Sequence, residues 1–570
     1  MKNYRQQLID YLADSCDIPV AVLNKALEVP PQSELGDFAF PCFVLAKELR
    51  RSPMEIAQNL QQLVNERLPD WLHSVENKGP YLNFFLDRAA VADSTLREIL
   101  DSKADYGNSE MGADQTVLVE YSSPNIAKPF HVGHAFSTVL GQVIGNFYQA
   151  LGYKVIRLNH LGDYGTQFGK LIAAWQHWGD EEALKADPIT ELTRCYVKFH
   201  EEAKAHPELE DEGRENFRLL ENKDPEAVRL WQHFRDVSLE EFQRIYDRMG
   251  ITFDNYNGES FYSDKIPAVI DRLRDLGLLE ESEGAQVVNL EEFDLNPCLI
   301  LKSDGTTIYA SRDLAAVYYR DQEWNFFRNI YVVGLPQTNH FKQIFAVLKK
   351  AGFPKADNCV HVAFGTVKFA DGEFSTRSGN VIKLEDLINR SVEKTANIIR
   401  TNNPDFSEEE ISEIAESVGL AAVNFTYLHN GRERDIYFDW DEVLDFEGDT
   451  APYLLYTLVR GKSILRKAEW QEKGEIELSK LVADDEYALV KYLAQYPDIL
   501  KQAAERYEPG HLLRLLLNIA RSFNRFYHNQ SILNTEDVEL RQARLTLTAA
   551  MCQVLENGLK LCAIPTVERM

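Results

Sequence analysis

The stretch from residue 116 to residue 158 constrains the fold more than any other, because two strands and a long apolar helix follow one another within it. TVLVEYS at its start has the composition of a strand. Apolar residues then recur at helical spacing from Phe136 to Leu151, and Gly152 ends this helix before the second strand, KVIRLNHL. Strands joined through a helix run parallel. The sequence therefore predicts an α/β protein with a parallel sheet.

The loop between the first strand and the helix, SSPNIAKPFHVGH, carries the groups with the most obvious chemistry. Pro124 and Pro129 stiffen this loop, Lys128 adds a positive charge, and His131 and His134 face the same side of the helix start. Ligands of open α/β sheets bind beyond the carboxyl ends of strands, and a helix N-terminus favours anions. The loop therefore predicts a polyphosphate site, where fixed donors stabilise charge on an α-phosphate.

Two plainer interpretations of the histidines remain open. Paired histidines near a helix start also occur as helix caps or as packed polar residues. Zinc proteases space their histidines four apart with a glutamate between them, and this loop has no such glutamate. The seven cysteines are scattered and never spaced CxxC, which argues against a disulfide framework and a zinc knuckle. We expect no protein-bound structural metal.

Further strand signals follow a charged, helical segment that has the character of an insertion into the sheet domain. Helical patterns such as RDLAAVYYRD separate these strands, which predicts that they continue a doubly wound sheet. Beyond about Leu384 the pattern is almost entirely helical. The insertion spans about 176–253, and the strand signals lie at 287–290, 297–303, 306–311, 329–334 and 361–369.

Composition indicates a globular protein of several domains that stays in the cytoplasm. Hydrophobic residues make up 45% and charged residues 26% of 570 residues, without a long apolar run or an apolar leader. The net charge of −28 argues against nucleic acid as a partner. However, residues 451–570 hold 16 Lys and Arg against 15 Asp and Glu, so this tail carries +1 and the first 450 residues carry −29. Basic faces are therefore possible on the tail.

Several motifs together resemble one enzyme family. HVGH after a strand resembles the HIGH signature of class I aminoacyl-tRNA synthetases, and VEYSSPNIAKPFHVGH with LNHLGDYGTQFGKL resembles the arginyl-tRNA synthetases. The resemblance extends to YASRDLAAVYYR, to the loop GEFSTRSGNVIKLEDL, to YLLYTLVRGKSILRK and to the ending VERM. It implies a Rossmann-type parallel-sheet catalytic core with an α+β N-terminal domain and an all-α C-terminal anticodon-binding domain.

The resemblance also implies where these domains lie. Residues 1–110 would form the N-terminal domain that contacts the tRNA elbow, and residues 111–390 the catalytic domain with its helical insertion. Residues 391–448 would form a helical connector, and residues 449–570 the DALR-type anticodon-binding domain.

The reaction implied by the resemblance has two steps. The carboxylate of L-arginine attacks the α-phosphate of ATP, which carries Mg²⁺, and the terminal adenosine of tRNA-Arg then attacks the acyl carbon of arginyl-adenylate. The family's second signature, KMSKS, is here E-F-S-T-R-S at 373–378, which offers an arginine but no lysine, so Lys128 is expected to replace the missing lysine. The implied catalytic residues are His131, His134, Lys128 and Arg377, and the implied ATP-binding residues are His131, Gly133, His134, Ser375 and Thr376.

Recognition of arginine requires hydrogen-bond acceptors, because a guanidinium has five fixed donors and no acceptor. Asp313 follows an arginine at a helix start, so a helix cap or an ion pair is the alternative role for this residue. LGDYGTQFG borders the active site in the family, but the resemblance assigns no role to each of its residues. The implied arginine-binding residues are Glu120, Asn125, Tyr309, Asp313 and Gln337.

The resemblance also implies tRNA contacts at both ends of the chain. Tyr81 and Asn83 match positions that read a D-loop base, although their alternation equally fits one face of a strand. Near the C-terminus, Arg521 and Arg525 lie among aromatic residues, which suits contact with phosphates and splayed anticodon bases. Aromatic residues on helices are more often buried in the core, so we expect some of these to be buried and the arginines to be exposed.

Two other functions remain as alternatives. One is a nucleotidyltransferase that uses HxGH without tRNA, although such enzymes are usually much smaller. The other is a non-catalytic synthetase-like protein that binds RNA, for which the absent KMSKS lysines are an argument. The expected partners are tRNA-Arg, L-arginine and ATP, with no membrane, and by analogy with the family we expect a monomer.

Overall fold

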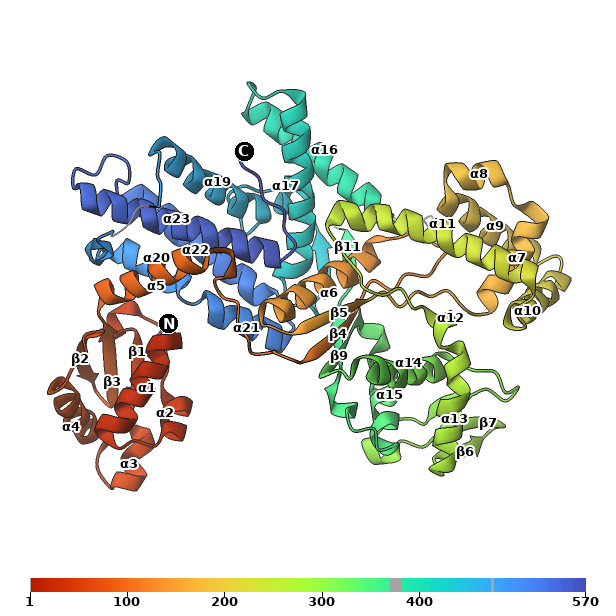
Figure 1. The fold of residues 1–570 in the computed structure, drawn as a ribbon, viewed down its shortest axis with the longest axis horizontal. Helices are drawn as coiled ribbons and strands as arrows, with labels where there is room; N and C mark the ends of the chain where they lie inside the picture. Colours follow the sequence, from red (N-terminus) through yellow and green to blue (C-terminus); the bar gives the residue numbers. More distant parts are fainter. Residues whose placement is uncertain (1, 370–381, 473–475) are drawn as a thin grey trace.

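A four-stranded parallel sheet forms the centre of the computed structural model, which describes residues 2–369, 382–472 and 476–570 (Figure 1). The order of its strands is β10-β9-β4-β5, and every neighbouring pair is parallel. The predicted strand–helix–strand unit is confirmed as β4, α6 and β5. The elements of this core are β4 (Thr116–Glu120), α6 (Val132–Ala150), β5 (Lys154–Leu158), α14 (Tyr309–Trp324), β9 (Arg328–Gly334), α15 (Thr338–Lys350) and β10 (Cys359–Phe364).

The strand order reverses between β4 and β9. From β4 the chain continues through α6 to β5 on one side, whereas β9 continues through α15 to β10 on the other side. Glu120, the last residue of β4, stands opposite Tyr331 of β9. Because the two connections leave in opposite directions, the region beyond the carboxyl ends of these two strands is where ligands of such sheets bind, and we refer to this region as the crevice.

Helix α6 packs closely on the back of β4. Its apolar face is buried, as the spacing of its apolar residues predicted. At Gly141 an added Cβ would lie 2.2 Å from the Tyr121 side chain, so only glycine allows the helix this close to the loop that follows β4. The Tyr121 hydroxyl donates to the Thr252 carbonyl at 2.6 Å and so ties this loop to the end of the helical insertion.

The insertion is a bundle of five helices between β5 and a smaller sheet. It extends to one side of the molecule, as Figure 1 shows for α7 to α11. The bundle packs on itself through α7, α9 and α10, whose buried faces are apolar. Its helices are α7 (Thr166–Trp178), α8 (Glu181–Ala186), α9 (Pro188–Glu202), α10 (Glu208–Glu221) and α11 (Pro225–Met249).

Three of the strand runs predicted for the second half of the core do not join the parallel sheet. The runs at 287–290 and 297–303 do not join the parallel sheet, because β7 and β8 pair antiparallel with each other and β7 with β6. The run at 306–311 becomes the start of helix α14, since β-branched residues precede a helical apolar pattern there. The elements of this region are α12 (Glu259–Tyr262), α13 (Ile266–Asp275), β6 (Leu279–Ser282), β7 (Ala285–Val288) and β8 (Cys298–Leu301).

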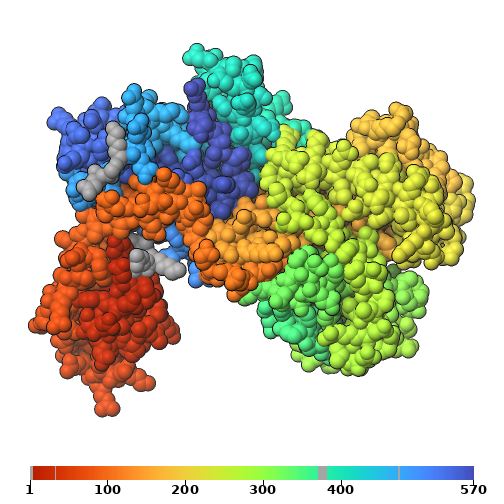
Figure 2. Space-filling view, in the orientation of Figure 1, coloured from red at the N-terminus to blue at the C-terminus, as the bar shows by residue number. Residues whose placement is uncertain are grey.

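The N-terminal body is an antiparallel sheet, β1-β3-β2, covered by helices, and it projects from the rest of the molecule (Figure 2). Helix α5 leads from it into the C-terminal helices, where Arg88 pairs with Asp484 at 2.8 Å and Asp37 pairs with Lys491 at 3.2 Å. Its elements are α1 (Lys2–Cys16), α2 (Val20–Ala26), β1 (Phe38–Pro41), α3 (Phe43–Leu49), α4 (Pro53–Asn65), β2 (Leu72–Lys78), β3 (Tyr81–Leu86) and α5 (Arg88–Ser102).

The C-terminal third is helical, with one exception that the sequence did not reveal. Residues 436–438 form β12, which pairs in parallel with β11. In the part of the chain that is described, no helix is long and apolar enough to cross a membrane. The elements are β11 (Val367–Phe369), α16 (Leu384–Asn402), α17 (Glu408–His429), β12 (Ile436–Phe438), α18 (Trp440–Val443), α19 (Ala451–Lys467), α20 (Asp484–Leu493), α21 (Tyr496–Arg506), α22 (Gly510–Asn529) and α23 (Val538–Leu561).

Candidate active site

The loop between β4 and α6 has a strained backbone. Ser122, Ser123 and Ala127 all have positive φ, between 47° and 66°, which residues other than glycine rarely adopt. Buried hydroxyl groups hold this conformation: the Ser122 amide donates to Ser137 Oγ at 3.0 Å, and the Ala127 amide donates to Ser238 Oγ at 3.1 Å. Strain of this kind persists where the surrounding structure enforces it, most often at functional sites.

The two histidines cap helix α6 reciprocally. His131 Nδ1 accepts a hydrogen bond from the Gly133 amide at 3.1 Å, and His134 Nδ1 accepts one from the His131 amide at 3.3 Å. Their rings stack with centroids 3.8 Å apart. The helix-capping role, which was the alternative for these histidines, is therefore present. Capping fixes the orientation of both rings and does not exclude a role in chemistry.

This capping determines what the histidines offer a ligand. Because Nδ1 is an acceptor in both rings, the remaining proton lies on Nε2, which leaves one N–H donor on each ring. Burial lowers the pKa of His131, and burial together with the charges of His131 and Lys128 lowers the pKa of His134 to about 3. Both rings are therefore neutral donors at the N-terminus of α6, where the helix dipole also favours a phosphate.

Because both histidines are neutral, the positive charge near this helix start comes from Lys128. Lys128 is exposed on the loop just before the histidines. From residue 382 onward the chain lies against the same loop, since the Val132 amide donates to the Ile382 carbonyl at 3.2 Å and the Leu384 amide donates to the Phe130 carbonyl at 2.9 Å.

Among the described residues, no group of three or more His, Cys, Asp or Glu side chains is placed to hold a metal ion. Three predicted site residues lie outside the described residues: Ser375, Thr376 and Arg377.

The segment LGDYG joins the site to the helical insertion. An added Cβ on Gly162 would lie 2.1 Å from Asn125 Oδ1, so this glycine lets the β4 and β5 loops touch. Asp163 is fully buried and caps α12 by accepting from the Ser260 amide at 2.9 Å, while Arg235 of α11 approaches its other oxygen at 3.3 Å. These contacts give structural roles to two residues whose roles the sequence left unassigned.

Glu120 already binds a guanidinium, that of an internal arginine. Arg320 Nη2 donates to Glu120 Oε2 at 2.5 Å, and His160 Nδ1 lies 4.0 Å from the same oxygen. Arg320 is 1% exposed and its guanidinium lies over the rings of Tyr262 and Tyr331 at 5.8 and 5.5 Å from their centroids. The buried carboxylate is therefore neutralised by a cation that cannot lose its proton, and both charges are compensated away from water.

Asp313 has a different partner, a histidine. His340 Nε2 lies 2.5 Å from Asp313 Oδ2, and both side chains are about one quarter exposed, at 25% and 24%. Tyr309 is 62% exposed at the start of α14, and Gln337 is exposed at the turn that precedes α15. Of the five predicted arginine-binding residues, these three therefore present polar or aromatic groups at the surface of the crevice.

A second ion pair, between Arg312 and Glu259, lies beside Asp313. It replaces the ion pair of Asp313 with the preceding arginine that the sequence left open as an alternative. Arg312 does not pair with Asp313 but lies 3.4 Å from Glu259 Oε2, with its guanidinium 4.9 Å from the centre of the Tyr309 ring. Burial raises the pKa of Glu259 to about 7, against the opposing pull of Arg312. The helix start is thus held by Arg312, and the Asp313 carboxylate is left to face the crevice.

Two of the carboxylates predicted to bind arginine lie near the ends of the two middle strands. Burial raises the pKa of Tyr331 well above its ordinary value, and the charges of both Glu120 and Asp313 contribute, so both carboxylates lie near one phenol. Sequence reasoning missed Arg320 and His340. The sequence contains an indication of Arg320, because Asp313 and Arg320 are seven residues apart and so lie on one face of a helix. It contains no such indication of His340, which lies after a different strand.

The N-terminal contact residues differ in exposure. Tyr81 is partly exposed at the start of β3, and its ring meets Phe43 edge to face at 6.0 Å. Asn83 is 2% exposed in the middle strand of the sheet. The exposed aromatic pair of Tyr81 and Phe43, which the sequence did not suggest, is therefore the accessible part of this surface.

The two predicted C-terminal arginines are exposed, as expected, but a third arginine, Arg460, is the one that lies between two exposed aromatic rings. Arg521 is paired with Asp449, and Arg525 lines a cavity between the N-terminal body and the C-terminal helices. Arg460 instead lies between two exposed aromatic rings, 4.8 Å from the centre of Tyr456 and 5.4 Å from that of Tyr527. The residues that line a cavity of about 570 Å³ here include Tyr453, Tyr456, Arg460, Asn524 and Met570.

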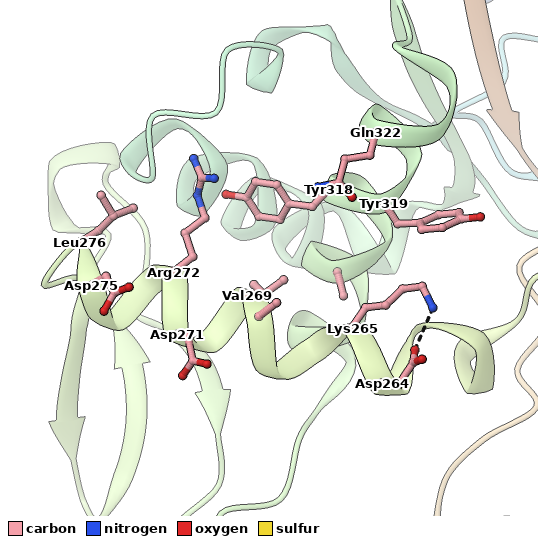
Figure 3. A pocket seen from close by; sticks show the side chains of 12 residues that line it. Asp264, Lys265, Val269, Asp271, Arg272, Asp275, Leu276, Tyr318, Tyr319 and Gln322 are labelled. Carbon is pink, nitrogen blue, oxygen red and sulfur yellow. Dashed lines mark hydrogen bonds and ion pairs between the residues drawn. The ribbon is translucent and has the colours of Figure 1, made fainter.

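Another cavity, of about 830 Å³, lies between α13 and α14 (Figure 3). Tyr318 and Tyr319 form one wall, Arg272 lies over the Tyr318 ring at 5.0 Å, and Lys265 lies over the Phe261 ring at 4.0 Å. None of the predicted site residues is among the described residues that line this cavity. The crevice at the ends of β4 and β9 therefore remains the candidate active site.

Comparisons with known proteins agree with this placement. Residues 95–440 match the model of the class I tRNA synthetase (R) catalytic domain, residues 2–86 match the arginyl tRNA synthetase N-terminal domain, and residues 454–570 match the DALR anticodon binding domain. The chain belongs to the arginyl-tRNA synthetase family. The predicted α/β core with an α+β N-terminal domain and a helical anticodon-binding domain is confirmed.

Individual members of the arginyl-tRNA synthetase family are similar over the whole chain. The arginine-tRNA ligases of Clostridium botulinum and Clostridium acetobutylicum are each 49% identical over 568 residues, with 100% of both chains covered. The solved arginyl-tRNA synthetase of Thermus thermophilus has a TM-score of 0.82 at 25% identity and covers 99% of this chain and 100% of its own. That of Plasmodium falciparum has a TM-score of 0.80 at 24% identity, with 100% and 99% covered.

The neutrality of the two histidines is testable by NMR. With ¹⁵N-labelled histidine, we expect His134 to show an unprotonated Nδ1 and a protonated Nε2 throughout pH 8 to 5, and His131 to show the same tautomer at pH 8 and to titrate below the ordinary histidine pKa, because burial lowers both pKa values. Titration of His134 near pH 6.5 would contradict the neutral-donor assignment.

Proposed function

We propose that the chain attaches L-arginine to tRNA-Arg through an arginyl-adenylate, with release of pyrophosphate and AMP. The observation that carries this proposal is the neutral histidine cap at the start of α6 together with Glu120 at the end of β4 and Asp313 in the first turns of α14. One half of the crevice suits a polyphosphate and the other half suits a guanidinium. Full-length similarity to arginine-tRNA ligases supports the same reaction.

The first step needs positioning and charge stabilisation rather than a protein nucleophile. An oxygen of the arginine carboxylate attacks the α-phosphorus of ATP, and the bond to the pyrophosphate oxygen breaks. His131 and His134 would donate their Nε2 protons to phosphate oxygens as charge moves onto them, and the amides of the first turn of α6 would add further donors. Mg²⁺ would arrive with ATP and share the charge of the leaving pyrophosphate, with Lys128 and Arg377 as the protein's cations.

The second step transfers the arginyl group to RNA. A hydroxyl of the terminal ribose of tRNA attacks the acyl carbon of the adenylate, and AMP leaves with the electron pair of the broken C–O bond. Tyr81 with Phe43 would stack on an exposed base of the tRNA elbow, and Arg460 with Tyr456 and Tyr527 would receive anticodon bases.

A second candidate function is an RNA-binding relative that has lost the reaction. The altered E-F-S-T-R-S segment at 373–378 is the observation that favours it, since a lysine-rich loop is absent there. The intact histidine pair and the acceptors of the crevice favour catalysis. The domain boundaries at 110, 390 and 448, the cytoplasmic location and the monomeric state stay predictions.

Arginine-dependent exchange of labelled pyrophosphate into ATP tests the reaction. We expect exchange with arginine but not with lysine or glutamine, and only when tRNA-Arg is present, because RNA docking completes the site. The His134→Ala variant should lower this exchange by about 10²-fold or more while tRNA affinity stays nearly unchanged, because one phosphate donor is lost. A folded chain that binds tRNA-Arg but shows no exchange would favour the RNA-binding alternative.

The role of Arg460 is tested by equilibrium binding of tRNA-Arg at fixed salt. Replacement Arg460→Met removes the cation between two aromatic rings, so we expect the Kd for tRNA to rise about tenfold. The matched variant Arg506→Gln removes one exposed charge from the same domain and should change Kd by less than about twofold. Equal effects of the two variants would reduce the role of Arg460 to its net charge.

A further inference from the structure

The two carboxylates of the arginine crevice are neutralised by partners of different kinds. Glu120 pairs with Arg320, which is fully buried and keeps its charge at every physiological pH. Asp313 pairs with His340, whose charge can change near neutral pH. One acid of the crevice is therefore compensated permanently, and the other is compensated only while its histidine is protonated.

The position of His340 makes this difference accessible to a ligand. His340 is the third residue of α15, which begins just beyond the carboxyl end of β9, and Asp313 lies in the first turns of α14. Their Nε2 and Oδ2 atoms are 2.5 Å apart, and each side chain is about one quarter exposed. A guanidinium that reaches Asp313 from the crevice therefore meets a carboxylate oxygen already held by the imidazole.

Other charged groups surround this pair on each neighbouring element. Glu259 of α12 and Arg312 of α14 form an ion pair beside Asp313, and Asp313 in turn raises the pKa of Glu259. His361 of β10 bonds to the Val333 carbonyl at 2.9 Å and has a pKa lowered by burial. Among the charged side chains of the described residues, Asp313 is the one that pairs with the His340 imidazole.

The balance of these effects shifts the titration of His340 toward the charged form in the free protein. Burial lowers the pKa of His340, but the hydrogen bond and the negative charge of Asp313 outweigh burial and leave that pKa above its ordinary value. A fraction of the molecules at neutral pH therefore carries a His340–Asp313 ion pair. Deprotonation leaves an imidazole that still donates one N–H to Asp313 but no longer neutralises it.

We propose that His340 is a positioning residue that makes arginine binding depend on pH: its neutral form orients Asp313, and its protonated form competes with the guanidinium of arginine for that carboxylate. This inference rests on the proposed function, since it takes Asp313 as an acceptor for substrate. Arginine then binds preferentially to the protein with neutral His340, so binding releases a proton, and arginine affinity rises with pH through the titration of His340.

Isothermal titration of the full-length chain with L-arginine at pH 7, in buffers of different ionisation enthalpy, measures this proton directly. We expect the wild type to release a fraction of a proton for each arginine bound, and His340→Gln, which keeps an N–H donor without a titratable charge, to release none. Arginine affinity of the wild type should rise from pH 6 to pH 8, whereas that of His340→Gln should change by less than about twofold over the same range. His340→Ala, which lacks the donor, should bind weakly at every pH.

Glu259 is the competing source of a released proton, because its pKa of about 7 lies in the same range. The Glu259→Gln variant should therefore keep the proton release, and loss of release in this variant but not in His340→Gln would overturn the inference. If His340→Gln folds poorly, His340→Asn and the wild-type affinity profile provide the same test, and a flat wild-type profile would refute the inference. Absence of any arginine binding by the wild type, with tRNA-Arg present as well as without it, would instead refute the proposed function.

Discussion

The parallel pairing of β4 with β9 is the constraint on which the rest of the structure depends. It sets two strand ends side by side, with Glu120 at one and the turn to α15 at the other. The loop after β4 then has to reverse into α6 over a short distance, and it does so with three residues in the left-handed region. Both the capped start of α6, which we propose as the phosphate site, and the position of Glu120 result from this one junction.

Electrostatic compensation explains how so acidic a chain can bind both ATP and a cationic amino acid. On the side proposed for phosphate, the available donors are imidazoles and backbone amides, and burial lowers the pKa of both His131 and His134. The arginine side uses carboxylates that would be costly to leave unpaired, so Arg320 and His340 stabilise them while no substrate is bound. Neither solution depends on net charge, which is why the value of −28 is a poor guide to partners.

The sequence predicted the junction but not its internal partners. The β4–α6–β5 unit followed from periodicity alone, since its strands and its helix are strongly apolar. The antiparallel pairing of β7 with β8 could not be predicted from the sequence, because short apolar strands do not indicate which sheet they join. Likewise, Glu120 and Asp313 were found through family positions, whereas Arg320 and His340 act through contacts 200 and 27 residues away in sequence. Arg460 was missed because its two aromatic neighbours come from different helices.

A crystal structure of the full-length chain with bound L-arginine tests the central claim most directly, namely that the crevice at the ends of β4 and β9 is an arginine site. The account predicts the guanidinium at Asp313 beside Tyr309, with the α-carboxylate directed toward Nε2 of the two histidines. Arginine in the cavity between α13 and α14, or anywhere outside the crevice, would contradict the account.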